Sequence, residues 1–177
     1  HLPEDDSVHL IDQTEKICTI GIWGPRARDI VQSLTNVDMS HKEFKFGWAK
    51  EINISKLNVW AFRISYVGDL GWEIYIPTKY GQDVWDLLFE AGKSHGIIPA
   101  GIGVYGTTGR LEKGYRLFGA ELEGEYNPIE AGLMRPKVKT QDFIEKDALM
   151  TLRKKDPIAI MCTLTVDNHE SSIGELR

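Results

Sequence analysis

A single glutamate, Glu73, is the residue of this sequence best placed to bind a flat ligand that is rich in hydrogen-bond donors. It lies at the end of the run Arg-Ile-Ser-Tyr-Val-Gly-Asp-Leu-Gly-Trp-Glu, which begins at Arg63. A carboxylate offers two acceptor oxygens side by side, so it can accept two parallel hydrogen bonds from one ligand edge. The alternative is an ordinary glutamate on the exposed face of a strand, since glutamate is mostly exposed in proteins.

A β-hairpin is the element that would hold Glu73 in place. Residues 57–66 and 72–76 are rich in β-branched, aromatic and aliphatic side chains, and two glycines and an aspartate lie between them. This pattern predicts two antiparallel strands joined by a short loop. Because side chains alternate along a strand, Glu73 should share its face with Tyr75 and, across the hairpin, with an aromatic or apolar partner.

The other expected elements alternate between strands and helices. Thr78 is expected to cap a helix whose apolar face contains Val84, Trp85, Leu88 and Ala91. The remaining elements are a strand over residues 17–23, a helix that begins just after Pro25, helices over residues 107–117 and 142–152, and a half-buried strand over residues 158–166.

Composition indicates an ordinary globular protein and excludes several function classes. The 177 residues carry a net charge of -5 and no dense cluster of Lys and Arg, which argues against nucleic acid as the main partner. No apolar run approaches the roughly 18 residues needed to cross a membrane, and the polar first residues give no indication of a signal peptide. Cys18 and Cys162 lie far apart, as in a reducing compartment, and the five histidines show no metal-ligand spacing.

Four ordered motifs carry a family resemblance. They are Ser-Tyr-Val-Gly-Asp-Leu-Gly-Trp-Glu-Ile-Tyr at 65–75, Gly-Arg-Leu-Glu-Lys-Gly-Tyr-Arg at 109–116, Asn-Pro-Ile-Glu-Ala-Gly-Leu at 127–133 and Asp-Phe-Ile-Glu-Lys-Asp-Ala-Leu at 142–149. Together they resemble the glycine-cleavage T-protein (aminomethyltransferase) superfamily. The second motif is most similar to the folate-binding C-terminal part of sarcosine and dimethylglycine dehydrogenases.

This resemblance implies an α+β fold and a chain that is a fragment of a longer protein. Residues 1–152 would form the rear part of an aminomethyltransferase-like folate-binding domain, incomplete at its N-terminal side. Residues 153–177 would form a connector and the first strand of a C-terminal β-barrel.

The resemblance also implies three cofactor-binding residues. In the family, the tyrosine and glutamate of the hairpin motif line the tetrahydrofolate pocket, and here they are Tyr66 and Glu73. A pterin presents a ring N–H beside an amino group, which suits a carboxylate, and a tyrosine adds an aromatic wall with a polar tip. In T-proteins an Ala-Arg-Asp triplet supplies an arginine to the folate; Tyr105 takes roughly that place, as a tyrosine does in the dehydrogenases, and is the third candidate, with a buried core tyrosine as the alternative. Asp69 is expected to shape the turn.

The implied function is the tetrahydrofolate-binding part of a one-carbon transfer enzyme. In such an enzyme a methylene group passes from an oxidised N-methyl glycine derivative to tetrahydrofolate. The expected partners are folate, a small N-methylated amino acid and the missing N-terminal part of the same protein, with FAD only in a missing upstream domain. The family's catalytic aspartate lies upstream, so no catalytic residue is expected in this chain, and the fragment alone should be inactive.

Two alternative functions and two cellular locations remain possible on the sequence alone. The first alternative is a stand-alone glycine-cleavage aminomethyltransferase, and the second is a non-enzymatic folate-domain relative with a regulatory or assembly role. The resemblance places the protein in the bacterial cytoplasm or the mitochondrial matrix.

Two further patterns have competing interpretations. Residues 101–106 match G-x-G-x-x-G, but the preceding residues carry a proline and are too short for the central strand that a dinucleotide fold requires. Arg110 with Glu112 and Lys113 forms either a functional cluster or a helix surface with local ion pairs.

Overall fold

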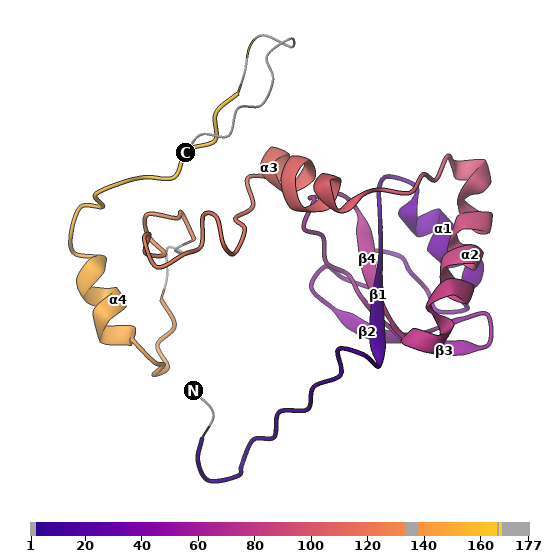
Figure 1. Ribbon diagram of the computed structural model, residues 1–177, viewed down its shortest axis with the longest axis horizontal. Coiled ribbons are helices and arrows are strands. Elements are labelled where there is room, and N and C mark those ends of the chain that lie inside the picture. Colours follow the sequence, from indigo (N-terminus) through magenta and orange to yellow (C-terminus); the bar gives the residue numbers. More distant parts are fainter. Residues whose placement is uncertain (1–2, 134–137, 166, 168–177) are drawn as a thin grey trace. The chain divides into compact units, whose positions relative to one another are not determined.

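The computed structural model describes residues 3–133, 138–165 and 167, and the chain divides into two compact units. Unit 1 is His1–Tyr105 and unit 2 is Gly106–Arg177. One antiparallel sheet and two longer helices belong to unit 1, whereas unit 2 contains short helices and long connecting segments (Figure 1). The expected α+β fold class is therefore confirmed.

Unit 1 is built on a four-stranded antiparallel sheet with the strand order β1-β4-β3-β2. Two 3₁₀ turns, η1 and η2, precede and follow its longest helix. In chain order the elements are β1 (Ile17–Trp23), α1 (Ala27–Leu34), β2 (Ala49–Ile54), β3 (Leu57–Phe62), β4 (Gly71–Pro77), η1 (Thr78–Tyr80), α2 (Gly81–Gly92) and η2 (Lys93–His95).

The core of unit 1 lies between one face of the sheet and the helices α1 and α2, which are neighbours on that side (Figure 1). Trp72, Ile74 and Ile76 alternate along β4 and are completely buried. They pack with apolar side chains from β2, β3, α1 and α2, among them Ile52, Ile54, Val59, Ala61, Ile30, Val31, Val84 and Leu88. Glu73 and Tyr75 therefore lie on the opposite face of the sheet.

The structure confirms the predicted strand over residues 17–23 and the antiparallel pairing of the hairpin, but it corrects the hairpin loop. β3 ends at Phe62 and β4 begins at Gly71, so the connection spans residues 63–70 and is longer than expected. β3 contacts β4 over three residue pairs, and the last of these pairs Phe62 with Glu73.

The expected cap at Thr78 is wrong. Its hydroxyl donates to the carbonyl of Glu15 at 3.0 Å, and the 3₁₀ turn η1 separates it from α2, which begins at Gly81. The helical face is otherwise as expected, since Val84 and Leu88 are buried, but Trp85 is 42% exposed.

Unit 2 corrects two helix boundaries. A π-helical segment, Val104–Gly109, begins at the last residues of unit 1 and continues into α3 (Arg110–Lys113), so the helix expected over residues 107–117 starts earlier and ends earlier. It ends because Gly114 adopts a left-handed conformation with φ of 74°, which glycine tolerates best. The helix expected from residue 142 is α4 (Lys146–Leu152), which begins after Glu145, a residue with φ of 66°.

The strand expected over residues 158–166 is not formed in the described part of that segment, residues 158–165. Ile158, Ile160 and Leu164 are 98%, 72% and 75% exposed. The segment is attached by the amide of Met161, which donates to the carbonyl of Glu130 at 2.9 Å. A half-buried strand needs a neighbour, and the described residues of unit 2 offer no strand to pair with it. Residue 166 lies outside the described residues, and the start of a barrel stays a prediction.

Candidate ligand-binding site on the open face of the sheet

Glu73 lies on the inner strand β4, on the sheet face that α1 and α2 do not cover. This face, which we call the open face, carries Thr19, Gly21, Trp60, Phe62, Glu73 and Tyr75. Glu73 is opposite Gly21 on β1 and opposite Phe62 on β3. The carboxylate therefore has a residue without a side chain on one side and an aromatic ring on the other, as the sequence predicted for the hairpin side.

Two tyrosine hydroxyls donate to the Glu73 carboxylate. The Tyr75 hydroxyl is 2.9 Å from Oε2, and the Tyr105 hydroxyl is 3.5 Å from Oε1. Burial raises the pKa of Tyr75, and its hydrogen bond to Glu73 raises it further. Burial likewise raises the pKa of Tyr105, to which the charge of Glu73 adds. Both phenols therefore stay protonated near neutral pH and act as donors.

Three further aromatic rings pack against the two tyrosines that donate to this carboxylate. The Tyr105 ring centroid lies 5.2 Å from that of Tyr66 and 5.3 Å from that of Trp23, and the Tyr75 and Phe62 centroids are 4.8 Å apart. We call this group the Glu73 cluster; it comprises Trp23, Phe62, Tyr66, Glu73, Tyr75 and Tyr105.

Trp23 keeps its place in the cluster through a hydrogen bond and a glycine. Its indole Nε1 donates to the carbonyl of Ile64 at 3.1 Å. A Cβ atom at Gly21 would overlap the indole ring, so the absence of a side chain at Gly21 lets the ring lie over β1. The cluster thus combines flat apolar walls with one charged acceptor, the combination that suits a flat, hydrogen-bonding heterocycle.

All three predicted site residues, Tyr66, Glu73 and Tyr105, belong to the Glu73 cluster. Tyr105 is half-buried and lies outside the apolar core of unit 1, unlike the core tyrosine considered as its alternative. The alternation along the strand predicted the correct face for Tyr75 but no role, and no sequence pattern indicated Trp23. The signal for Tyr75 was its spacing of two from Glu73, whereas nothing local connects Trp23 with Tyr105. Ligand binding by these residues stays a prediction.

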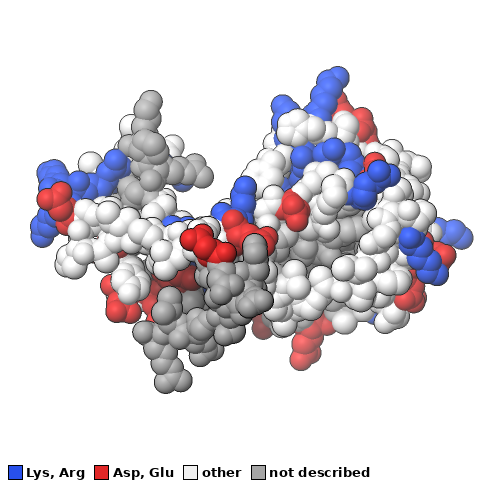
Figure 2. All heavy atoms as spheres, turned by 90° about the horizontal axis from the view of Figure 1, so that it is seen from above, with Lys and Arg blue, Asp and Glu red and all other residues white. Residues whose placement is uncertain are grey.

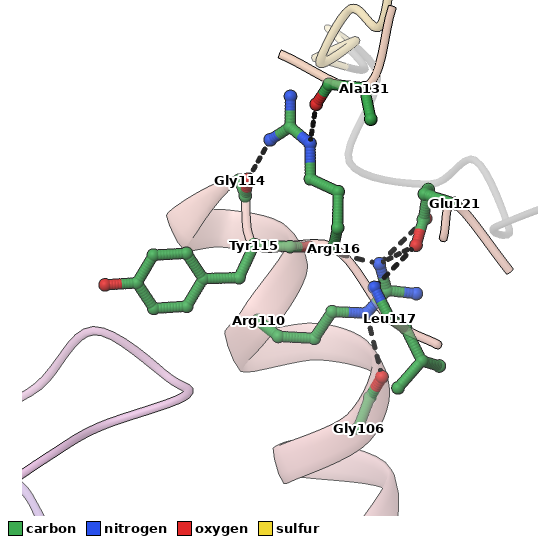
Figure 3. A network of polar contacts seen from close by, with 8 residues as sticks. All are labelled: Gly106, Arg110, Gly114, Tyr115, Arg116, Leu117, Glu121 and Ala131. Atoms are coloured by element: carbon green, nitrogen blue, oxygen red, sulfur yellow. Dashed lines mark hydrogen bonds and ion pairs between the residues drawn. The ribbon is translucent and has the colours of Figure 1, made fainter. Parts of the chain in front are cut away.

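Arg110 belongs to a separate polar network inside unit 2 (Figure 3). Its Nη1 lies 2.8 Å from both carboxylate oxygens of Glu121, and its Nε donates to the carbonyl of Gly106 at 2.9 Å. Glu121 also accepts the amide of Leu117 at 3.0 Å. Arg110 is only 6% exposed, so it joins α3 to the chain that follows rather than forming ion pairs with its neighbours in sequence.

Glu130 has a similar connecting role in unit 2. It is 8% exposed, and its Oε2 accepts the amide of Asn127 at 3.1 Å. Its Oε1 accepts the amide of Ile158 at 3.3 Å. The motif at 127–133 therefore ties the segment around Ile158 to the rest of the unit.

The remaining candidate features give no second site. Residues 96–100, all of them described, form no strand before the glycines of the G-x-G-x-x-G match, so the context of a dinucleotide fold is missing there. Within the described residues, no three His, Cys, Asp or Glu side chains group to hold a metal ion. The part of the chain that the structure describes also contains no helix of the length and apolarity needed to span a membrane. On the face seen in Figure 2, Lys and Arg side chains lie in small groups among Asp and Glu.

The fold and the Glu73 cluster define a class: an α+β domain whose antiparallel sheet is covered by helices on one face and offers an aromatic-lined carboxylate on the other. Residues 1–141 match the family model of the GCVT N-terminal domain. The chain belongs to this family, and the resemblance inferred from the four motifs is confirmed.

Named relatives support the same assignment. The mitochondrial dimethylglycine dehydrogenase of Homo sapiens is 38% identical over 151 residues, which are 84% of this chain and 17% of that protein. The aminomethyltransferase of Thermoanaerobacter sp. (strain X514) is 36% identical over 149 residues, 84% of this chain and 40% of that protein. The chain thus spans less than half the length of either relative and is an aminomethyltransferase- or dimethylglycine dehydrogenase-like domain.

One solved structure shows a weaker likeness. It is the heterotetrameric sarcosine oxidase from Corynebacterium sp. U-96 in complex with pyrrole 2-carboxylate. It matches with a TM-score of 0.47 and 15% sequence identity, over 55% of this chain and 49% of that chain.

Proposed function

We propose that this chain is the tetrahydrofolate-binding part of a one-carbon transfer enzyme, which passes a methylene group from an oxidised N-methyl glycine derivative to tetrahydrofolate. The proposal rests on membership of the GCVT N-terminal domain family and on one observation, the Glu73 carboxylate surrounded by aromatic rings on the open face. The dimethylglycine dehydrogenase relative favours this substrate class. The aminomethyltransferase relative favours the second candidate, a part of a glycine-cleavage enzyme.

The residues of the Glu73 cluster fit the edge and the faces of a pterin. A carboxylate accepts about four hydrogen bonds, and the two tyrosine hydroxyls use only two of these positions. Glu73 can therefore still accept a ring N–H and the adjacent amino group of the pterin. Tyr66, Trp23 and Tyr105 offer ring faces for contact with the heterocycle.

The contribution of this chain to the reaction is positioning. Bound tetrahydrofolate supplies the nitrogen atoms that accept the one-carbon unit. Glu73 would fix the edge of the pterin that carries the ring N–H and the amino group. The aromatic rings would fix the plane of the pterin and exclude water from its faces. This positioning reduces the entropy lost on reaching the reactive geometry. We place no catalytic acid or base in this chain, and FAD chemistry would belong to another domain of the longer protein.

The proposed location follows the names of the relatives, and the domain plan follows the resemblance of the sequence motifs. The human relative is named as mitochondrial, and the other is bacterial, so we propose the mitochondrial matrix or the bacterial cytoplasm. The division of the chain near residue 152, with a C-terminal barrel beginning after it, also stays a proposal.

Substituting Glu73 with glutamine in the full-length protein should weaken tetrahydrofolate binding by on the order of 1.5–3 kcal/mol, because a charged acceptor is lost while the shape is kept. Isothermal titration calorimetry of wild type and variant measures this. Glu51→Gln is the matched control, since Glu51 is an exposed glutamate on the open face of β2, away from the cluster. Equal affinities of wild type and Glu73→Gln would sink the proposed role of Glu73.

A further inference from the structure

We infer that the two tyrosine hydroxyls on Glu73 have different roles: Tyr75 positions the carboxylate for the ligand, and Tyr105 binds one of its oxygens only weakly. This inference rests on the proposed function and assigns a positioning residue to the same site. It starts from the unequal lengths of the two hydrogen bonds, 2.9 Å for Tyr75 and 3.5 Å for Tyr105.

Tyr75 is held on the same rigid element as Glu73. The two residues are two positions apart on β4, which lies between β1 and β3 in the sheet, so their backbones are fixed by pairing on both sides. The Tyr75 ring also packs against Phe62, with centroids 4.8 Å apart. Ring and strand together direct the hydroxyl at Oε2 of Glu73. A 2.9 Å bond to a charged acceptor from a fixed donor is the stronger kind of hydrogen bond.

Tyr105 approaches Glu73 from outside the sheet. Residues 96–101, between η2 and the π-helical segment that contains Tyr105, lie in neither helix nor strand. Its ring is held by contacts with Tyr66 and Trp23, but these contacts leave the hydroxyl at 3.5 Å from Oε1, beyond the usual range for a strong hydrogen bond. Displacing that hydroxyl therefore costs little.

The difference decides what each hydroxyl does when a ligand arrives. A ligand with two adjacent donors needs one lone pair on each carboxylate oxygen. Tyr75 can keep its bond to Oε2 throughout, because that oxygen has a second lone pair, and the bond stops the carboxylate from rotating. Tyr105 satisfies Oε1 in the absence of ligand, but its 3.5 Å bond neither fixes the carboxylate nor keeps a ligand donor from the second lone pair of that oxygen.

Two matched substitutions separate these roles, since each removes one hydroxyl from the same carboxylate and keeps the ring. In the full-length protein, Tyr75→Phe should weaken tetrahydrofolate binding about tenfold, whereas Tyr105→Phe should change it by less than about twofold. The effect of Tyr75→Phe should vanish in the Glu73→Gln background, because a residue that acts through Glu73 has nothing left to position. A purely structural role would give the same loss in both backgrounds.

Equal losses for the two single variants, or additive losses in the double variant, would overturn the inference. A second measurement covers the case in which the wild type binds no tetrahydrofolate, an outcome that contradicts the proposed function itself. The ¹³C signal of the Glu73 side-chain carboxyl, recorded without ligand, should shift more in Tyr75→Phe than in Tyr105→Phe. Shifts of equal size would show that Tyr75 does not fix the carboxylate.

Discussion

Replacing Trp72 with alanine should lower the free energy of unfolding of unit 1 by about 3–5 kcal/mol, the range for deleting a large aromatic side chain from a core. Trp72 is completely buried on β4, and its ring lies against Phe44, with centroids 6.0 Å apart. Arg28 and Arg63 each place the guanidinium carbon 5.9 Å from the ring centroid. Alanine would remove all of these contacts and leave a cavity between the sheet and its helices.

Trp60→Ala is the matched control. Trp60 lies on the neighbouring strand β3, but it is 52% exposed on the open face. Its loss should cost about 1 kcal/mol or less, since substitutions at exposed positions have small effects. Urea unfolding followed by circular dichroism compares the two variants without relying on tryptophan fluorescence. Equal losses would mean that the open face is buried as tightly as the core.

The sheet has one buried face and one open face, and this arrangement explains which of its strands could be predicted from the sequence. Apart from Glu73, β1 and β4 consist of apolar, aromatic and β-branched residues with glycine at a boundary, so their sequence signal is strong. β2 was not predicted, although Ile52 and Ile54 face the core and alternate with polar residues, because these two isoleucines are the only strongly apolar residues in its six positions. The turn that follows β2 carries no Asn-Gly or Asp-Gly signal; instead Ser55 adopts a left-handed conformation with φ of 57°.

The helix ends of unit 2 were mispredicted for a local and a nonlocal reason. Gly114 is a recognisable stop signal just after Lys113, but the helix predicted over residues 107–117 extends beyond it. The partner of Arg110 is Glu121, which is 11 residues away and therefore outside the spacing of helical ion pairs. Such a pair depends on how the chain turns after the helix, which no short pattern specifies.

The candidate site also has one part that a local sequence pattern predicts and another part that only the fold brings together. Glu73 and Tyr75 share a strand, so the period of two sufficed to place them on one face. Tyr66 and Tyr105 were named only through the family resemblance, because 39 positions separate them in sequence. Their rings meet through the folding of unit 1, and the contact between Trp23 and Tyr105 arises in the same way.

Replacing Glu121 with alanine should destabilise unit 2 by on the order of 3 kcal/mol, because removing one partner of a buried pair leaves the other charge uncompensated. The side chains of Arg110 and Glu121 are only 7% and 23% exposed. The variant would also leave the amide of Leu117 without its acceptor. Hydrogen exchange at the Leu117 and Tyr115 amides should accelerate on the order of a hundredfold, whereas exchange in β4 of unit 1 should not change.

Glu90→Ala provides the control for Glu121→Ala. Glu90 pairs with Lys93 on the surface of unit 1, where the two side chains are 71% and 60% exposed. An exposed pair contributes about 1 kcal/mol or less, so this variant should unfold almost like the wild type. Losses of similar size in the two variants would show that burial adds nothing to the pair of Arg110 and Glu121.

The pH dependence of stability provides an independent test of the pair of Arg110 and Glu121. Burial acts to raise the pKa of Glu121, but the hydrogen bonds from Arg110 and the Leu117 amide and the charge of Arg110 outweigh it and bring the pKa below its ordinary value of 4.5. A carboxyl group with a depressed pKa in the folded state stabilises the fold fully above the pKa of the unfolded chain. This contribution is lost as the pH falls through the lower folded-state pKa. The difference in stability between wild type and Glu121→Ala should therefore be largest near neutral pH and shrink below about pH 4.5, which hydrogen exchange at the Leu117 amide over a series of pH values would measure. A difference that persists unchanged into strong acid would show that the Glu121 charge does not stabilise unit 2.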